Sequence, residues 1–509
     1  MKLLKFLLSR MVIVGIILAI QVAWFVGILA TFSNYSMQIS FACALLSWVA
    51  IIWIINKPEN PAYKIAWIIP ILTFPILGGL LYLAFGTKKP SKAMREKLAK
   101  VIGETRHFLR QNEAVFEEVR TLDEHVAGQA YYIANSAGFP IHKNTEVQYH
   151  KIGEESYKIL LEELKKAKHF IFMEYFIIEE GHMWNSILKV LEDKAKAGVD
   201  VRLLYDDVGC VSLLPYGYHK QMEAKGIKCI PFNPFIPIFS VAMNNRDHRK
   251  ITVIDGHTAF SGGINLADEY INEKVRFGHW KDTGIRIKGE AVWNFTLMFL
   301  QMWNAYRKTD DDYEIFRPHV NKEDIFTSDG FVQPYGDSPL DGEIVGESVY
   351  MNILNNAKRY VYIFTPYLII DNEMTTALCL AAKRGVDVRI VTPGIPDKKT
   401  VFRLTQSYYA QLIKAGVKIY EYTPGFIHAK SFVCDDEVAT VGTINMDYRS
   451  LYLHFECGVF MYKTSAIRDI KADALDTIAK SKEITIEDCN RGLIIGLGQA
   501  ILRGFAPLM

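Results

Sequence analysis

The sequence predicts an α/β protein in which two similar lobes form a pseudo-two-fold body, preceded by an N-terminal helical membrane anchor. Three observations predict this fold: long apolar runs at the start of the chain, a strand–helix–strand pattern that occurs twice, and a short polar motif that occurs once in each repeat. The chain has 509 residues, of which 50% are hydrophobic, so it is long enough and apolar enough to bury more than one core.

Apolar runs near the N-terminus predict the membrane anchor. Residues 11–32 and 37–55 are each about as long as a helix that crosses ~30 Å of hydrocarbon. A third apolar stretch, 65–85, contains prolines and glycines and fits either a hairpin or a third span, of which we favour the hairpin. Basic residues precede the first run and follow the third, which places both the N-terminus and the body in the cytoplasm. The sequence therefore predicts a multi-pass protein of the cell membrane with a cytoplasmic body.

From about residue 140 onward, strands alternate with helices, and the order repeats. The segment 169–178 has the pattern of a buried strand, a helical segment follows up to Gly198, and "VDVRLLYDD" is the next strand. The same order returns at 360–370, with a helical segment that ends at Gly385 and the strand "VDVRIVTPG". A duplication of about 180 to 190 residues explains both copies and predicts two similar α/β lobes.

The composition divides the chain into six segments. Basic residues follow the apolar region, an acidic stretch separates the two repeats, and the C-terminus is apolar. That last segment is expected either to lie at the membrane interface or to pack on the body. The predicted segments are a membrane region (1–86), a basic helical connector (87–139), the first lobe (140–309), a linker (310–335), the second lobe (336–475) and the C-terminal segment (476–509).

The motif H-x-K-x4-D occurs once in each lobe, at the corresponding place. Both copies continue to a glycine and an asparagine at the same spacing. Residues i and i+2 of a strand lie on one face, so the imidazole and the ammonium group of each copy point the same way. Pairing of the lobes then gathers two imidazoles, two ammonium groups and two amides around one point. The residues are His248, Lys250, Asp255 and Asn265 in the first lobe, and His428, Lys430, Asp435 and Asn445 in the second.

Such a set of side chains suits a phosphodiester. One imidazole attacks phosphorus, the other protonates the departing alkoxide, and the lysine and asparagine donors stabilise charge on the equatorial oxygens. Four fixed donors take the place of a metal ion, and no cluster of cysteine or histidine has the spacing of a zinc site. We therefore expect no metal and no cofactor.

Carboxylates are expected to hold the two imidazoles in the reactive tautomer, because a neutral attacking imidazole needs its other nitrogen hydrogen-bonded. The candidates are Asp282 and Glu456, which lie 34 and 28 residues after the motif histidine of their own lobe. Asp255 and Asp435 stand one or two residues before turns, so they either brace the end of a strand or take part in catalysis directly.

These residues carry a resemblance to a known family. With "NNRDHRK", "GGIN", "HWKDTGIRIKGEAV", "FIHAK" and "GTINMDYRS", nearly the whole chain resembles the phospholipase D superfamily with two HKD motifs, and within it the bacterial cardiolipin synthases. The resemblance implies two phospholipase D-type lobes, each a mixed sheet flanked by helices, that work without a cofactor. It also implies phosphatidyl transfer between two phosphatidylglycerol molecules, giving cardiolipin and glycerol through a phosphohistidine, with His248 as nucleophile and His428 as general acid and base. The implied partners are phosphatidylglycerol and anionic membrane lipid.

Two positions depart from the pattern of that family. His454 stands where many members have asparagine two residues before the orienting acid, and Asp247 precedes the first motif histidine where asparagine is commoner. Neither departure removes a catalytic group. They leave open fine details of the pocket, including which hydroxyl acceptor is preferred.

Other functions fit parts of the sequence. The same constellation serves a hydrolytic phospholipase D or a phosphatidyltransferase that uses another alcohol, and the identity of the product separates these. A nuclease or phosphodiesterase is disfavoured by the membrane anchor and by a net charge of +2, so we expect no nucleic-acid partner. A scaffold with an inactive site is disfavoured because every motif residue is present in both lobes. No oligomeric state follows from the sequence.

Overall fold

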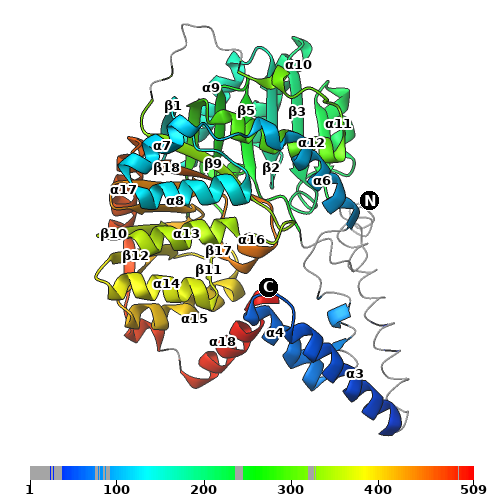
Figure 1. Ribbon diagram of the computed structural model, residues 1–509, viewed down its shortest axis with the longest axis vertical. Helices are drawn as coiled ribbons and strands as arrows, with labels where there is room; N and C mark the ends of the chain where they lie inside the picture. Colours follow the sequence, from blue (N-terminus) through cyan, green and yellow to red (C-terminus); the bar gives the residue numbers. More distant parts are fainter. Residues whose placement is uncertain are drawn as a thin grey trace.

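Two mixed β-sheets form the centre of the protein, which we describe from a computed structural model (Figure 1). Helices flank both sheets, so the predicted α/β class is confirmed. Besides isolated positions between 23 and 86 and at 326, the structure describes residues 37–74, 92–234, 245–318, 328–490 and 492–508.

The first sheet has the strand order β1-β8-β6-β5-β2-β3-β4. β2, β3 and β4 run parallel to one another, and the other neighbours are antiparallel. Its strands are β1 (Thr145–His150), β2 (Phe170–Tyr175), β3 (Asp200–Asp206), β4 (Lys228–Phe232), β5 (Lys250–Ile254), β6 (Thr258–Gly262) and β8 (Gly284–Gly289). The helices of this lobe are α9 (Gly153–Lys166), α10 (His182–Lys196), α11 (Tyr218–Ala224) and α12 (Val292–Tyr306).

The second sheet has the order β19-β13-β12-β10-β15-β16-β18-β9. Its strands are β9 (Phe331–Asp337), β10 (Tyr360–Phe364), β12 (Asp387–Pro393), β13 (Lys418–Tyr422), β15 (Ser431–Cys434), β16 (Val438–Gly442), β18 (Glu456–Tyr462) and β19 (Ser481–Ile484). Its helices are α13 (Val345–Asn356), α14 (Asn372–Lys383), α15 (Lys399–Lys414), α16 (Tyr448–Tyr452) and α17 (Ala466–Ala479). Short two-stranded pairings join β11 (Leu368–Ile369) to β17 (Met446–Asp447), and β7 (His279–Lys281) to β14 (Gly425–Ile427).

The two sheets repeat one topology. Starting from β9, the second order is β9-β18-β16-β15-β10-β12-β13, and each strand has a counterpart at the same place in the first sheet. The motif strands β5 and β15 correspond, so both H-x-K-x4-D motifs occupy the same position in their lobes. The second sheet has one further strand, β19, which pairs with β13. The second lobe therefore extends beyond residue 475, where the sequence predicted that it ends.

A glycine ends the first crossover helix of each lobe. Gly198 follows α10 with φ +89°, and Gly385 follows α14 with φ +91°. This left-handed conformation costs glycine little, and it turns the chain into the parallel strands β3 and β12. The repeated "GVDVR" is thus a helix end followed by a largely buried strand.

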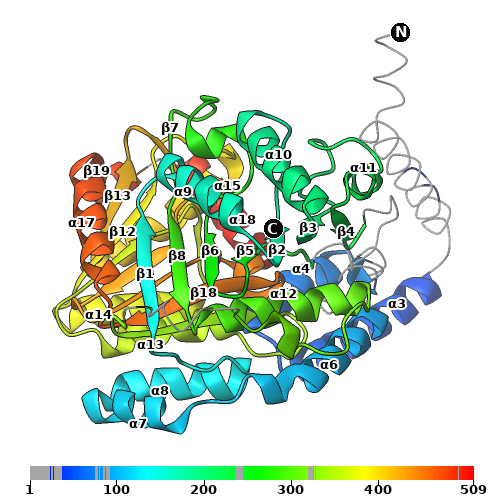
Figure 2. The same cartoon turned by 90° about the horizontal axis from the view of Figure 1, so that it is seen from above.

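Helices from the connector and from the end of the first lobe cover the junction between the sheets. α12 contacts strands of both sheets, and residues 292–304 of this helix are all buried. α6 packs along α12, and α7 and α8 lie along the same side of the body (Figure 2). These connector helices are α6 (Lys92–Thr105), α7 (Glu113–Leu122) and α8 (Glu124–Tyr132).

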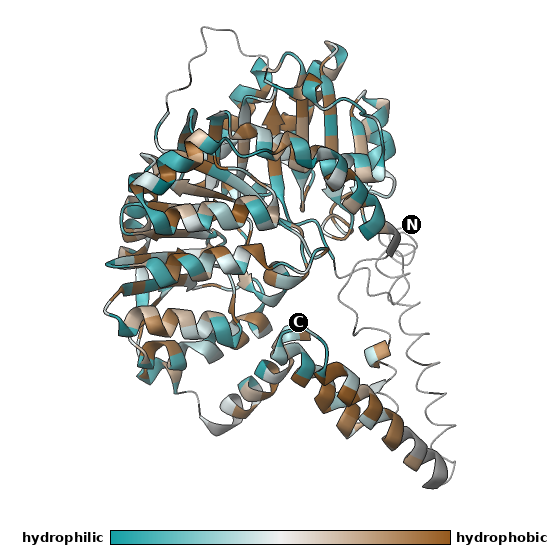
Figure 3. Ribbon diagram, in the orientation of Figure 1, coloured by the Kyte–Doolittle hydropathy of each residue, from teal (hydrophilic) through white to brown (hydrophobic). Residues whose placement is uncertain are grey.

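An apolar helical hairpin, α3 (Met37–Ile55) and α4 (Pro61–Thr73), extends away from the sheets (Figures 1 and 3). Among the helices that the structure describes, none is both long and apolar enough to cross a membrane. The predicted span over 37–55 is therefore not supported, and the predicted span over 11–32 lies outside the described residues apart from two isolated positions. α4, which begins before the third apolar stretch and enters it, has 13 residues, fewer than the roughly 20 that a span needs.

The C-terminal helix α18 (Leu493–Phe505) contacts the body through α15. Gln499 Nε2 donates to the Arg403 carbonyl over 3.0 Å, and Arg503 Nη2 donates to Gln411 Oε1 over 2.9 Å. Apolar side chains elsewhere on α18 stay exposed. One part of the helix therefore packs on the second lobe, and its location at a membrane interface stays a prediction.

Candidate active site

Backbone contacts between the lobes position both motif histidines. Asp247 forms a parallel bridge with Phe455, and His248 N donates to the Phe455 carbonyl over 2.9 Å. At the related place, β7 pairs in parallel with β14, and His428 N donates to the Lys281 carbonyl over 2.7 Å. Each histidine therefore lies beside the residue that directly precedes an acid of the other lobe.

Each histidine is paired with a buried carboxylate. His248 Nδ1 lies 2.8 and 2.9 Å from the two carboxylate oxygens of Glu456, and His428 Nδ1 lies 2.6 Å from Asp282 Oδ2. Both carboxylates are fully buried, and Thr443 Oγ1 donates a further hydrogen bond to Glu456. Because a carboxylate accepts, Nδ1 is the protonated nitrogen of each ring, and Nε2 keeps its lone pair.

This pairing crosses the lobes, which the sequence spacing did not predict. The spacing assigned Asp282 to His248 and Glu456 to His428. This assignment is wrong, because the strand contacts between the lobes bring each acid to the histidine of the opposite lobe. Neither lobe therefore contains a complete histidine–carboxylate pair by itself.

Burial and mutual repulsion weaken the bases of the site. Burial, with Lys430 nearby, lowers the pKa of His428 to about 4, and burial together with Lys250 lowers the pKa of His248 well below its usual range. His428 also contributes to the low pKa of His248, so the two histidines share one electrostatic environment. Burial lowers the pKa of Lys250 to about 8 and that of Lys430 to about 7. Both imidazoles are neutral at pH 7, so the positive charge of the site comes from the two lysines, each of which donates to the carbonyl of its own motif histidine.

The low pKa of Lys430 leads us to expect pH-dependent anion binding. Its ammonium form is present below about pH 7 and is lost as the pH rises through this value, and Lys250 follows near pH 8. Sulfate keeps its charge over this range, so we expect its affinity to fall by about tenfold between pH 6 and pH 9. Calorimetric titration of the full chain measures this, and Lys430→Gln should remove the part of the pH dependence centred near pH 7 and leave the part near pH 8 that belongs to Lys250. Equal affinity at both pH values would contradict the assignment.

The two motif asparagines have different surroundings. Asn265 Oδ1 accepts from Ile177 N over 3.0 Å, and its Nδ2 donates to Tyr270 Oη over 2.7 Å, so this amide is held within the first lobe. Asn445 is buried, and its Oδ1 has no hydrogen-bond partner among the residues that the structure describes. Their role as phosphate donors stays a prediction.

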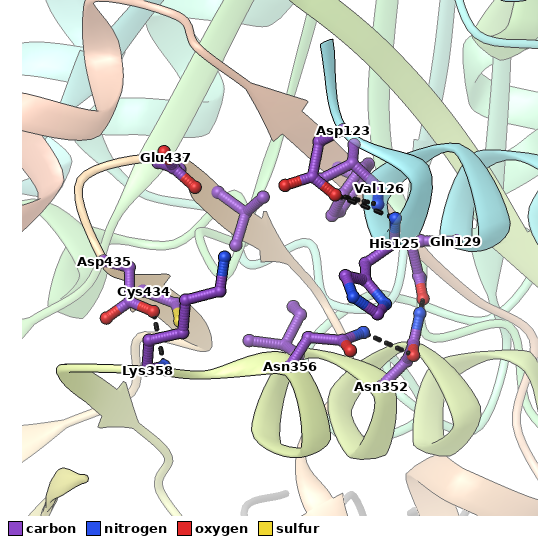
Figure 4. Close-up of a pocket in the computed structure, with 13 residues that line it drawn as sticks. Asp123, His125, Val126, Gln129, Asn352, Asn356, Lys358, Cys434, Asp435 and Glu437 are labelled. Atoms are coloured by element: carbon purple, nitrogen blue, oxygen red, sulfur yellow. Dashed lines mark hydrogen bonds between the residues drawn. The ribbon is translucent and has the colours of Figure 1, made fainter. Parts of the chain in front are cut away.

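The two motif aspartates brace the start of a neighbouring strand. Asp255 accepts hydrogen bonds of 2.8 to 2.9 Å from the backbone N–H groups of residues 168–170. Asp435 accepts three from residues 358–360, and Figure 4 shows it beside Lys358. Each aspartate stands seven residues after its motif histidine, which is about 20 Å along an extended chain. This geometry fits the bracing role rather than contact with a substrate.

Asp435→Asn is expected to destabilise the fold by about 2 kcal/mol, because the amide nitrogen that replaces one carboxylate oxygen cannot accept, so at least one of the three N–H donors loses its partner. The neighbouring Asp436→Asn is a matched control, since both aspartates have a positive φ and Asp436 is exposed. Its loss of ion pairs at the surface should cost less than about 1 kcal/mol. Denaturant unfolding of the full chain measures both values. Equal stability of the two variants would contradict the bracing role.

Aromatic rings surround the two histidines, and sequence reasoning did not single them out. The ring centre of Phe176 lies 4.9 Å from that of His248, and those of Tyr270 and Trp280 lie 5.5 Å from that of His428. Trp280 carried a signal, because it stands two residues before Asp282 in the same short run. Phe176 and Tyr270 reach the site only through the fold.

Comparisons with known proteins give matches over most of the chain. A family model described as "Cardiolipin synthase, PLD-like domain" matches residues 160–303 and 350–476, and one described as "Phospholipase_D-nuclease N-terminal" matches residues 45–86. A cardiolipin synthase of Geobacillus sp. (strain WCH70) is 36% identical, covering 93% of this chain and 94% of its own. An uncharacterized protein of Streptococcus mutans is 47% identical, covering 90% of this chain and 99% of its own. The crystal structure of a phosphatidylserine synthase of Haemophilus influenzae superposes with a TM-score of 0.54 at 15% identity, covering 75% of this chain and 97% of that one, which shows a likeness of fold.

Proposed function

The chain belongs to the cardiolipin synthase family of phospholipase D-like proteins, and we propose that it transfers a phosphatidyl group from one phosphatidylglycerol to another. The products are cardiolipin and glycerol, and the intermediate is a phosphohistidine. The observation that carries this proposal is the pair of neutral imidazoles, each held at Nδ1 by a carboxylate of the opposite lobe and each with an available Nε2. Two buried lysines beside them supply the positive charge that a phosphodiester requires.

In the first half of the reaction, His248 Nε2 attacks the phosphorus of a phosphatidylglycerol. The bond from phosphorus to the oxygen of the headgroup glycerol breaks, and His428 gives its Nε2 proton to that oxygen, so that glycerol leaves. His428 must carry this proton although its pKa is about 4 in the unliganded site. The negative charge of the bound phosphodiester offsets the two ammonium groups and raises the pKa of His428 when substrate is present.

In the second half, a hydroxyl of another phosphatidylglycerol attacks the same phosphorus. His428 takes the hydroxyl proton, the nitrogen–phosphorus bond to His248 breaks, and cardiolipin leaves. Both histidines return to their starting states, so no cofactor or metal enters the balance. Asp282 supports the assignment of His428 as the acid and base, because its charge raises the pKa of that imidazole.

Transfer to an alcohol requires that water be kept from the intermediate. Water is present at about 55 M, so positioning of the acceptor and exclusion of water decide between transfer and hydrolysis. The aromatic rings of Phe176, Tyr270 and Trp280 line both histidines and reduce the space for water. This apolar lining supports a transferase over a hydrolase.

We also propose that the hairpin of α3 and α4 holds the protein at the cell membrane, with the catalytic body in the cytoplasm. The exposed apolar side chains of α3 support this, because contact of such a surface with water is unfavourable, whereas contact with lipid is favourable. The basic α6, which follows the hairpin, favours anionic lipid such as phosphatidylglycerol. The exposed apolar side chains are Phe41, Leu45, Leu46, Trp48, Val49, Ile52, Trp53 and Ile55.

Lipid analysis tests the proposed function. Purified protein is incubated with phosphatidylglycerol in mixed micelles without added divalent metal, and the products are separated by thin-layer chromatography and identified by mass spectrometry. Cardiolipin and free glycerol in equal amounts are expected. Phosphatidic acid as the main product would identify a hydrolase, and an absence of lipid turnover would favour a phosphodiesterase or a scaffold.

A further inference from the structure

A third imidazole, that of His454, lies beside the reacting pair and has no role in the two steps above. Its ring centre is 5.6 Å from that of His248, and its side chain is 10% exposed. Both ring nitrogens are buried and lack a hydrogen-bond partner within the described part of the chain. Burial lowers the pKa of His454 to about 4, so the ring is neutral at pH 7. A neutral imidazole offers one donor and one acceptor, and a ligand bound beside His248 could use those of His454.

The position of Glu456 decides which nitrogen of His454 carries the proton. His454 Nδ1 lies 3.8 Å from Glu456 Oε1, which is too long for a hydrogen bond but close enough for the carboxylate charge to favour a proton on Nδ1. His454 Nε2 then keeps its lone pair. His454 Nε2 is therefore a hydrogen-bond acceptor, and it suits a group that donates.

A metal ion is the first ligand to consider, because His454 forms a group with His248 and Glu456 whose potential ligand atoms all lie within 4.8 Å of one another. Two observations oppose it. The charges of Lys250 and Lys430 that disfavour protonation of His248 also disfavour a cation at the same place. In addition, His248 Nδ1 and Glu456 are hydrogen-bonded to each other, so these atoms are not free to ligate a metal ion. An anion is disfavoured as well, because Nε2 has no proton to donate to it. A neutral hydroxyl group remains.

We propose that His454 Nε2 accepts a hydrogen bond from the second hydroxyl of the acceptor's glycerol headgroup, the one that does not react. This binding site rests on the proposed phosphatidyl transfer and adds to it a preference for acceptors with two adjacent hydroxyls. The attacking oxygen must lie opposite His248 on the phosphorus, so it meets His428 rather than His454. A hydroxyl on the neighbouring carbon of the acceptor's glycerol can extend past the phosphorus toward His248. His454 lies beside His248 and can accept a hydrogen bond from this hydroxyl.

Competition between two soluble alcohols tests this site. The full-length protein receives phosphatidylglycerol as donor, with propane-1,2-diol and propan-1-ol at equal concentration as acceptors, and mass spectrometry gives the ratio of the two phosphatidyl alcohols. Loss of one buried neutral hydrogen bond corresponds to a factor of about three to ten. The wild-type protein should favour the diol by this factor. With His454→Leu the product ratio should fall to the value set only by the intrinsic reactivity of the hydroxyl groups of the two alcohols. His454→Asn keeps an acceptor oxygen and should retain part of the preference.

His150→Leu is the matched control, because His150 is also buried and both of its ring nitrogens lack a partner among the described residues, but it belongs to β1 of the first lobe. This variant should keep the wild-type ratio. A wild-type protein that transfers to both alcohols without preference overturns the site, and so does an active His454→Leu with an unchanged ratio. The wild-type comparison applies even if His454→Leu does not fold. Absence of transfer to any alcohol, including phosphatidylglycerol, would instead overturn the proposed function itself.

Discussion

His248→Ala and His428→Ala are each expected to lower the rate of cardiolipin formation by about four orders of magnitude or more. The first variant lacks the atom that bonds to phosphorus, and the second lacks the group that protonates the leaving glycerol. The remaining lysines and aromatic rings still bind the substrate, so the loss should fall on kcat rather than on KM. Steady-state assays with phosphatidylglycerol measure both parameters.

The two variants should differ with an activated donor. A phosphatidyl ester of p-nitrophenol has a leaving group that needs no proton, so His428→Ala is expected to release nitrophenol in a burst equal to the amount of enzyme. His248→Ala should give no burst. His150→Ala serves as control for loss of a buried imidazole, and it should match the wild type. Equal bursts from both motif variants would contradict their separate roles.

Glu456→Gln and Asp282→Asn are each expected to lower cardiolipin formation by about two to three orders of magnitude. The amide has nearly the shape of the carboxylate, but it stabilises neither the Nδ1-protonated tautomer nor the imidazolium. Each histidine then loses its reactive form while the packing stays the same. Unfolding measurements on both variants check that the fold is kept.

The crossed pairing makes this prediction specific. Glu456 is hydrogen-bonded to His248, so Glu456→Gln should affect the same step as His248→Ala and slow the burst with the activated donor by about two to three orders of magnitude. Asp282 bonds to His428, so Asp282→Asn should behave like His428→Ala and keep the burst. If each acid served the histidine of its own lobe, the two outcomes would be exchanged.

Much of the fold could be predicted from the sequence, because the duplication is visible in it. The repeated "GVDVR" marks a helix end and a buried strand in both lobes, and the two H-x-K-x4-D motifs occupy equivalent strands. The partner of each acid could not be predicted. Which strand of one lobe lies beside which loop of the other is a property of tertiary packing, and the bridge between Asp247 and Phe455 has no signal in local spacing.

The hydrogen-bond partners of individual side chains could not be predicted from the sequence either. Asn265 and Asn445 follow equivalent motifs, yet only Asn265 forms hydrogen bonds through both its amide oxygen and its amide nitrogen to residues of its own lobe. His454 was visible as a departure from the family pattern, but its lack of a partner depends on burial and on the 3.8 Å separation from Glu456. Sequence periodicity reports which residues are buried; it does not report which polar atoms find partners.

Detection of the covalent intermediate tests the central claim most directly. His428→Ala is mixed with the activated donor and quenched in alkali, which preserves phosphohistidine, and intact-mass and peptide analysis locate any adduct. We expect a mass increase of one phosphatidyl group on the peptide that contains His248, its absence from His248→Ala, and its conversion to cardiolipin in wild-type protein supplied with phosphatidylglycerol. Cardiolipin formation without an adduct on either histidine would contradict the mechanism.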